Sequence, residues 1–374
     1  MDTLILNVVG ILPEAIDTAT IFLERADGLP LDYQAGQFLT FLFDFHGRSA
    51  SGRELRRSYS LSSAPGVDPI PSITVKRVTN GEASRYLLDH LRVGDQLRSL
   101  PPAGRFLLEK RPAATADAMA GMPGPGGRVL FFIAAGSGVV PIFSLLKKAL
   151  AEEPGTRIVL ISQHHDDGSI PFFKKLEELE RDNKKRFRWV NLRSAKDGRL
   201  NNWWLEELLG ELLLEVPPGG AGKSTASRAD MLPGYSHPAF YLCGPPAFMR
   251  MAQFTLRVMG FTYSYIRKEN FTVEFVPPPP LLTDPSPKKI TIRAGGKTYQ
   301  YEAAWPATIL QAGLDRQIPL PYSCKGGRCS TCVARCINGK VKMSINEVLT
   351  EKDLQEGLVL TCVGYAETDV ELVL

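Results

Sequence analysis

The pattern of apolar and polar positions changes character along the chain. In roughly the first hundred residues, short strand-like runs alternate with turn residues, for example at 37–45, 56–62 and 72–77. One helical stretch, at 82–91, interrupts them. Short strands that follow one another in this way predict an antiparallel β-barrel, with the first strand near the N-terminus.

From residue 128 onward, the pattern switches to strands that alternate with helices. The continuous apolar run 128–135 is followed by glycines and then by a helical stretch at 139–151. The later strands of this pattern are expected at 157–162, 187–192 and 239–242, and the later helices at 171–183, 202–214 and 246–259. Alternation on this scale predicts an α/β domain with a parallel sheet and crossover helices.

Segments rich in Pro and Gly separate these regions. Two of them, 112–127 and 215–236, are interpreted as surface loops. The second contains GGAGKST, but a phosphate-binding loop needs a glycine five positions before Gly222, where Pro217 stands. The domains are therefore expected at 1–111, at 128–275 and at 288–374, after a proline-rich linker at 276–287 that reads as a semi-rigid spacer.

The composition limits the number of domains and the classes of partner that the chain can have. The 374 residues suffice for two or three domains, and 44% hydrophobic residues are ordinary for a globular protein. A net charge of +4 is too small to indicate a nucleic-acid partner. No apolar run reaches the roughly 18 residues that span a membrane. The N-terminus lacks the basic residues of an export signal, so a cytoplasmic protein is expected.

Five of the six cysteines lie in the last 51 residues, which favours a metal or cluster site over a disulfide framework. Cys324, Cys329 and Cys332 follow the spacing of plant-type 2Fe-2S ligands, with Cys362 as the expected fourth. Gly326 and Gly327, within the same loop, would let backbone amides point toward the cluster.

Three alternatives to this cluster stay open. A structural zinc ion could use Cys336 in place of Cys362, a 4Fe-4S cluster would want tighter spacing, and the thiols could simply be free. Cys336 itself is interpreted as a small buried residue on a strand.

Two groups of residues in the first domain suit a flavin. Residues 57–60 read Arg-Ser-Tyr-Ser on a strand, which offers a cation for phosphates, an aromatic face and a hydroxyl. A glycine and a serine then open the helix at 82–91, whose N-terminus can bind a pyrophosphate. The candidate FAD-binding residues are Arg57, Tyr59, Ser60, Lys76, Gly81 and Ser84.

Two strand-to-helix junctions of the second domain suit a nicotinamide nucleotide, because parallel sheets bind ligands at the carboxyl ends of their strands. The first junction reads Gly-Ser-Gly at 136–138, and the second reads Cys-Gly-Pro at 243–245. The candidate NAD(P)H-binding residues are Gly136, Ser137, Gly138, Pro141, Cys243, Gly244 and Pro245.

At these motifs the chain resembles the ferredoxin-NADP reductase superfamily along 1–275 and plant-type ferredoxins along 288–374. The segments 324–332, 339–343, 357–362 and 269–271 make it similar to reductase subunits of the phenylacetyl-CoA epoxidase type. The resemblance implies that Tyr59, Ser60 and Cys243 lie where hydride passes from nicotinamide to flavin.

Some positions depart from this family, in which Thr is usual where Val140 stands. Gln163 and His164 stand where Asn-Arg often binds the 2′-phosphate of NADP. Arg193 and Arg199 could supply that charge, so NADPH is expected as the coenzyme, with NADH as the alternative.

The resemblance implies an NAD(P)H oxidoreductase that passes electrons through FAD and the 2Fe-2S cluster to a partner oxygenase. A phenylacetyl-CoA epoxidase-type system is the expected one, and the linker would let the ferredoxin domain swing or hold it in place. The alternatives are a general ferredoxin or flavodoxin reductase and a non-catalytic iron–sulfur redox sensor.

Overall fold

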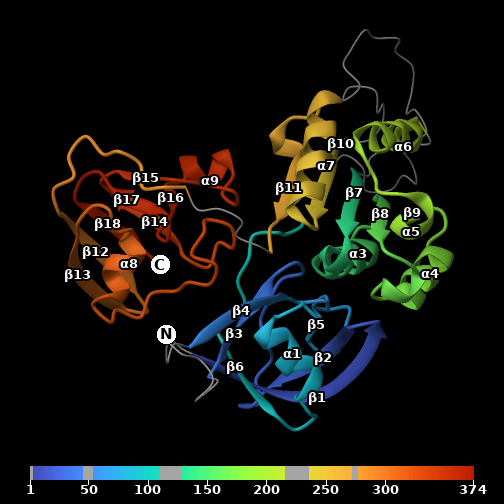
Figure 1. Cartoon of the computed structure of the whole chain (residues 1–374), viewed down its shortest axis with the longest axis horizontal. Coiled ribbons are helices and arrows are strands. Elements are labelled where there is room, and N and C mark those ends of the chain that lie inside the picture. Colours follow the sequence, from blue (N-terminus) through green and yellow to red (C-terminus); the bar gives the residue numbers. More distant parts are fainter. Residues whose placement is uncertain (1–2, 45–53, 110–127, 215–235, 272–276) are drawn as a thin grey trace.

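A computed structural model of the chain describes residues 3–44, 54–109, 128–214, 236–271 and 277–374. It contains three domains, which Figure 1 shows as separate lobes. The predicted loops at 112–127 and 215–236 lie outside the described residues, except that Ser236 is described and begins a strand. Within the described part, no helix combines the length and the apolar character that crossing a membrane requires.

The first domain is an antiparallel barrel of six strands, ordered β4-β3-β6-β1-β2-β5. A bridge between Leu61 and Ile73 links its two edge strands, and α1 (Glu82–Asp89) lies beside β5. The strands are β1 (Leu4–Ala15), β2 (Thr18–Arg25), β3 (Phe38–Phe43), β4 (Leu55–Ser60), β5 (Ser72–Lys76) and β6 (Gln96–Ser99). All six residues of β3 are buried, and the alternate residues Leu39, Phe41 and Phe43 belong to the hydrophobic core of the domain.

The second domain is a five-stranded parallel sheet, ordered β11-β10-β7-β8-β9. Every residue of the central strand β7 is buried, as expected for a strand covered on both faces. The strands are β7 (Arg128–Ala135), β8 (Arg157–His164), β9 (Phe187–Arg193), β10 (Ser236–Cys243) and β11 (Ile266–Glu269). One face carries α3 (Val139–Glu152) and α4 (Phe173–Asp182), and the other carries α6 (Asn202–Leu214) and α7 (Pro246–Val258).

The third domain is a small mixed sheet, ordered β13-β12-β18-β14-β16, with the helix α8 (Ile309–Leu314) on its core. Its strands are β12 (Lys288–Ala294), β13 (Lys297–Ala303), β14 (Val333–Asn338), β16 (Leu358–Leu360) and β18 (Val370–Val373). A second sheet pairs β15 (Val341–Met343) with β17 (Gly364–Ala366), and α9 (Glu351–Gln355) precedes β16. The parallel pairing of β12 with β18 gives it the topology of a β-grasp domain.

The described part of the linker, 277–287, follows the surface of the third domain. The indole Nε1 of Trp305 donates to the carbonyl of Pro280 at 3.1 Å, and Lys342 Nζ donates to the carbonyl of Leu281 at 3.1 Å. These topologies confirm the predicted fold class: a barrel, a parallel α/β domain and an α+β β-grasp domain.

Candidate functional site

The end of strand β4 forms one wall of the candidate site. Ser60 is buried there, while the ring of Tyr59 lies against Phe41 with 6.1 Å between ring centroids. Burial raises the pKa of the Tyr59 hydroxyl to about 12, so it stays protonated at neutral pH. Arg57 is exposed, and Lys76 ends β5 in a half-buried position.

The turn into α1 is tightly built. A Cβ on Gly81 would lie 2.7 Å from Ser84 Oγ, so only glycine fits. The Ser84 hydroxyl is buried and closes the turn: it accepts from the amide of Val78 at 3.1 Å and donates to the carbonyl of Gly81 at 3.2 Å. The first-turn amides of α1, rather than this hydroxyl, are therefore the groups available to an anion.

The two predicted strand-to-helix junctions touch each other. A Cβ on Gly138 would lie 2.1 Å from the carbonyl oxygen of Cys243 and 2.7 Å from the amide nitrogen of Gly244. Gly136 has a left-handed φ of +57°, which bends the chain from β7 into α3. Pro245 caps α7, and Pro141 is buried in the first turn of α3. The residues predicted for a nicotinamide nucleotide thus form one continuous edge of the sheet.

Glu269, the last residue of β11, connects this edge to the barrel. It is paired with Cys243 across the β10–β11 ladder and hydrogen-bonds with the Ser60 hydroxyl. Complete burial raises the pKa of its carboxyl to about 8, and the nearby Cys329 sulfur contributes in the same direction. The carboxyl therefore holds a proton at neutral pH, and its Oε2 atom has no hydrogen-bond partner among the described residues.

Cys243 is fully buried, and burial raises the pKa of its thiol well above the usual value, with Glu269 as a second cause. A protonated thiol of this kind is a poor nucleophile. Its carbonyl oxygen is one of the atoms that Gly138 approaches closely.

The four predicted ligand cysteines are arranged as two pairs. The thiols of Cys324 and Cys329 hydrogen-bond to each other, as do those of Cys332 and Cys362. Thr361 donates to the carbonyl of Cys332 from both its amide, at 3.2 Å, and its hydroxyl, at 3.0 Å. This holds Cys362, at the end of β16, beside a loop thirty residues earlier in the chain.

Backbone amides of the cysteine loop point at sulfur, as the two glycines suggested. The amide of Gly326 donates to Cys324 Sγ at 3.3 Å, and the amide of Cys324 donates to Cys329 Sγ at 3.4 Å. The hydrogen bond from Cys329, followed by the amides of Gly326 and Arg328, lowers the pKa of the Cys324 thiol to about 6. Lys325, Gly327 and Ser330 have positive φ, so the wrap is built from left-handed residues beyond the glycines.

Two pairs of thiolates are what two irons need, whereas one metal ion needs a single common centre. Among the described residues, no three His, Cys, Asp or Glu side chains surround such a centre. The thiol of Cys336 lies on β14 and donates to the carbonyl of Asn338 at 3.2 Å. The arrangement thus favours Cys362 over Cys336 as the fourth ligand.

The residues considered for the 2′-phosphate of NADP differ in burial and in the partners that they bind. His164 is only 3% exposed, and burial, assisted by Lys76, lowers its pKa to about 4, so it is neutral. Arg193 pairs with Asp167 at 2.5 Å between Nε and Oδ1. Gln163 binds the loop before Leu200 through its side-chain oxygen and nitrogen. Arg199 is exposed at that loop.

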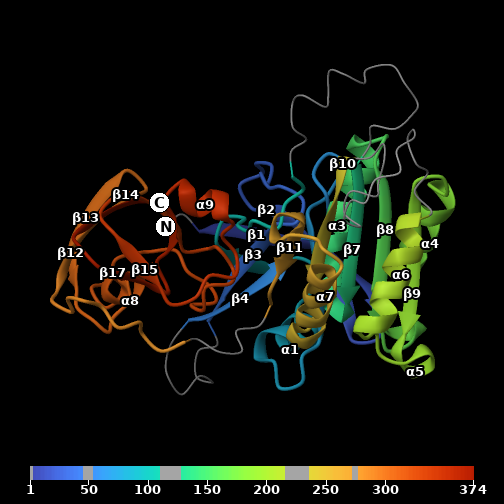
Figure 2. The same cartoon turned by 90° about the horizontal axis from the view of Figure 1, so that it is seen from above.

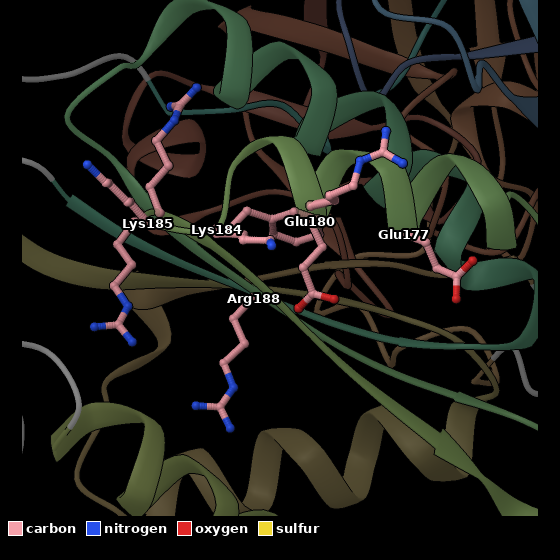
Figure 3. Close-up of a pocket in the computed structure, with 9 residues that line it drawn as sticks. Glu177, Glu180, Lys184, Lys185 and Arg188 are labelled. Atoms are coloured by element: carbon pink, nitrogen blue, oxygen red, sulfur yellow. The ribbon is translucent and has the colours of Figure 1, made fainter.

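A cavity of about 660 Å³ lies at the other end of the sheet, where β8 and β9 begin. Figure 3 shows its charged lining, which includes Glu177, Glu180, Lys184, Lys185 and Arg188. Because ligands of such sheets bind at the carboxyl ends of the strands, this cavity is not the nucleotide site.

Comparison with known proteins follows the same three-part division. The oxidoreductase FAD-binding domain matches residues 15–107, the oxidoreductase NAD-binding domain matches 132–253, and the 2Fe-2S iron-sulfur cluster binding domain matches 292–367. The ferredoxin reductase component of 3-ketosteroid-9-alpha-monooxygenase from Mycobacterium tuberculosis is 32% identical, with 91% of this chain and 84% of that protein aligned.

The chain belongs to the same family as this ferredoxin reductase component, whose members combine FAD-binding, NAD-binding and 2Fe-2S domains. A component of 1,2-phenylacetyl-CoA epoxidase from Escherichia coli K12 is 30% identical over 96% of this reductase and 93% of that component. The solved structure of phthalate dioxygenase reductase shares the fold, with a TM-score of 0.54 and 22% identity over 99% and 97% of the two chains. The reductase is an NAD(P)H oxidoreductase that uses FAD and a 2Fe-2S cluster.

The residues of the reductase fit these groups. The buried, unpartnered Oε2 atom of Glu269 lies beside Ser60, where the flavin edge is expected. The close approach at Gly138 leaves no room for a side chain beside a bound nucleotide. The paired cysteines supply four sulfur ligands in two sets.

Sequence reasoning quoted Glu269 only as part of a family motif and assigned it no role. A signal was present, because an acid ends a strand-like run, 266–269, at the carboxyl edge of the predicted sheet. Its burial against Ser60 is a contact between two domains, and no pattern within either segment contains that information.

Proposed function

We propose that this reductase takes hydride from NADPH at the edge of the parallel sheet and delivers single electrons through its cluster to an oxygenase component. One observation supports the proposal above the others: Glu269 contacts the candidate flavin residue Ser60, is paired with Cys243 at the nicotinamide junction, and lies close enough to the cluster ligand Cys329 to feel its charge. All three redox groups would therefore meet around one side chain.

The bound flavin would supply the conversion of a two-electron donor into two single-electron deliveries. The protein's part is to hold these groups. Tyr59 would give a bound flavin ring an aromatic wall, and Cys243 would shape the nicotinamide side. Glu269 and Ser60 would hold a proton in a dry environment beside that ring.

We further propose Cys324, Cys329, Cys332 and Cys362 as the cluster ligands, with the first two on one iron and the last two on the other. The amides directed at Cys324 and Cys329 support this assignment, because hydrogen bonds to cluster sulfurs set the potential.

The acceptor is proposed to be an oxygenase because the named relatives serve oxygenases of several kinds, including a stachydrine N-demethylase and a glycine betaine monooxygenase. A phenylacetyl-CoA epoxidase-type partner is one candidate. A 3-ketosteroid 9α-monooxygenase-type partner is the second, favoured by the 32% identity of the corresponding reductase component.

The deciding experiment is an anaerobic absorbance titration of the purified protein with NADPH and, separately, with NADH. The proposal expects the flavin bands and the longer-wavelength cluster absorbance both to bleach, more readily with NADPH. Bleaching of the flavin alone would reject the relay. Turnover of the two oxygenase types by the reduced protein would then choose between the partners, and a redox sensor would turn over neither.

A further inference from the structure

The loop that carries three of the cysteines is held against the rest of the protein by polar contacts. Ser323 Oγ lies 2.7 Å from Ser58 Oγ of strand β4, one residue before Tyr59. Arg56 Nη1 donates to the carbonyl of Tyr322 at 3.3 Å, and its guanidinium lies 3.9 Å above the Tyr322 ring. In Figures 1 and 2 the C-terminal domain accordingly lies beside the barrel and β11.

Glu347 makes the most revealing of these contacts, because its two oxygens serve different domains. Oε1 accepts from Arg328 of the cysteine loop at 3.0 Å, within its own domain. Oε2 accepts from Asn270 Nδ2 at 3.0 Å and lies 4.0 Å from Lys268 Nζ, both at the end of β11. These two reductase residues flank the buried Glu269. One carboxylate thus connects the cluster loop to the strand that ends at the flavin.

Two contacts between opposite charges cross this interface. Arg105 of the first domain pairs with Asp353 of the third, and Lys268 of β11 lies 4.0 Å from Glu347. Contacts of this kind give orientation and are weakened by salt, because each charge remains partly in water. A polar interface therefore suits two domains that associate and separate.

In this arrangement the cluster loop is largely covered. Within 322–332, all of which the structure describes, Lys325 is the one exposed residue. An external acceptor that approached the cluster through Tyr322 and Ser323 would have to displace the contacts that these two residues make with the barrel. The face through which the cluster would receive electrons is also the face that an acceptor would need.

We propose that Glu347 is an electrostatic latch, a positioning residue that holds the cluster loop against β11 while the cluster is loaded and releases it to the acceptor. The inference rests on the proposed function. In the latched state one electron leaves the reduced flavin and enters the oxidised cluster. In the released state the cluster passes that electron on to the acceptor.

Two substitutions break the latch from opposite sides. Asn270→Asp faces Glu347 with a second carboxylate and leaves the Arg328 contact intact. Glu347→Gln removes the charge that Lys268 and Arg328 share. Glu356→Gln is the matched control, because the ion pairs of Glu356, with Arg335 at 3.8 Å and Lys352 at 4.0 Å, both lie inside its own domain.

The first readout does not depend on activity: hydrogen exchange of the backbone amides of 322–329 in the holoprotein, at low and high salt. We expect faster exchange in both latch variants at low salt, to the level that the wild type reaches at high salt, and no change in the control. The second readout is the rate of cluster reduction after rapid mixing with NADPH. Losing one such contact should lower the equilibrium constant between the latched and released states by about tenfold, which is about 1.4 kcal/mol.

The rate of flavin reduction should stay at the wild-type value in both variants, and so should the absorbance of the oxidised cluster. Unchanged exchange and unchanged cluster reduction in both variants would overturn the proposal. An effect of Glu347→Gln without an effect of Asn270→Asp would overturn it too, because Glu347 would then act only on Arg328. If the wild type fails to reduce its cluster with NADPH, the proposed function fails, and hydrogen exchange still tests the latch.

Discussion

Replacing Gly138 by alanine tests the contact between the two nucleotide-binding junctions. The new Cβ would lie 2.1 Å from the carbonyl oxygen of Cys243, where ordinary contact begins at 3.4 Å. The two backbones would have to separate by about 1.3 Å. Cys243 ends the β7–β10 ladder and Gly138 follows the end of β7, so the clash is between backbone atoms and cannot be relieved by moving a flexible side chain. Overpacking of this kind costs about 2–3 kcal/mol of unfolding free energy.

The control is Gly136→Ala in the same turn. Its φ of +57° makes alanine strained, yet a Cβ there meets nothing within 4 Å, so the cost should be about 1 kcal/mol. Urea unfolding followed by tryptophan fluorescence reports on this domain, since Trp189, Trp203 and Trp204 all belong to it. The apparent KM for NADPH should rise about tenfold for Gly138→Ala. If Gly138→Ala were no less stable than Gly136→Ala, the reasoning would be refuted.

Three further predictions address the other sites. Cys362→Ser should abolish the cluster absorbance, whereas Cys336→Ser should retain it. Absorbance and an iron assay measure both, and the reverse result would make Cys336 the fourth ligand in place of Cys362. Arg199→Ala should raise the KM for NADPH about tenfold and leave the KM for NADH unchanged, while equal effects on both coenzymes would exclude a phosphate contact. Burial lowers the pKa of His164 to about 4 in the folded state, against 6.5 in the unfolded state, so the unfolded state binds the extra proton between these values. The free energy of unfolding should therefore be full above pH 6.5 and fall as the pH drops toward 4. At pH 5 the loss should be roughly 2 kcal/mol. His164→Asn should remove this dependence in urea unfolding at pH 7.5 and pH 5, and an unchanged pH profile would contradict it.

Much of the fold could be predicted from the sequence because its signals are local. In the run 128–135, Arg128 is followed by seven consecutive apolar residues. All eight are buried and form the central strand β7 with those bounds. The spacing of Cys324, Cys329 and Cys332 is likewise local, since one loop carries all three. The predicted strand at 157–162 continues to His164 in the structure, because Gln163 and His164 remain in the ladder with β9.

The parts that escaped prediction depend on contacts between distant segments. Arg193 was a candidate for the coenzyme phosphate, and its ion pair with Asp167 becomes visible only when the loop after β8 folds beside β9. The Ser84 hydroxyl was assigned to a ligand, yet it satisfies the backbone of its own turn. The role of Glu347 requires three segments, at 268–270, 328 and 347, whose proximity no periodicity encodes.

The linker that follows the surface of the third domain has a consequence for affinity. Because Pro280 and Leu281 are bound to that domain, only the residues between β11 and Pro280 tether it to the second domain. Tethers of this length create effective concentrations on the order of 1 mM. An interface with a dissociation constant near that value, about 4 kcal/mol, already keeps half of the molecules associated. A separate partner at micromolar concentration can then compete for the same loop through a small interface of its own. The domains associate because they are covalently linked, and their interface does not need high affinity.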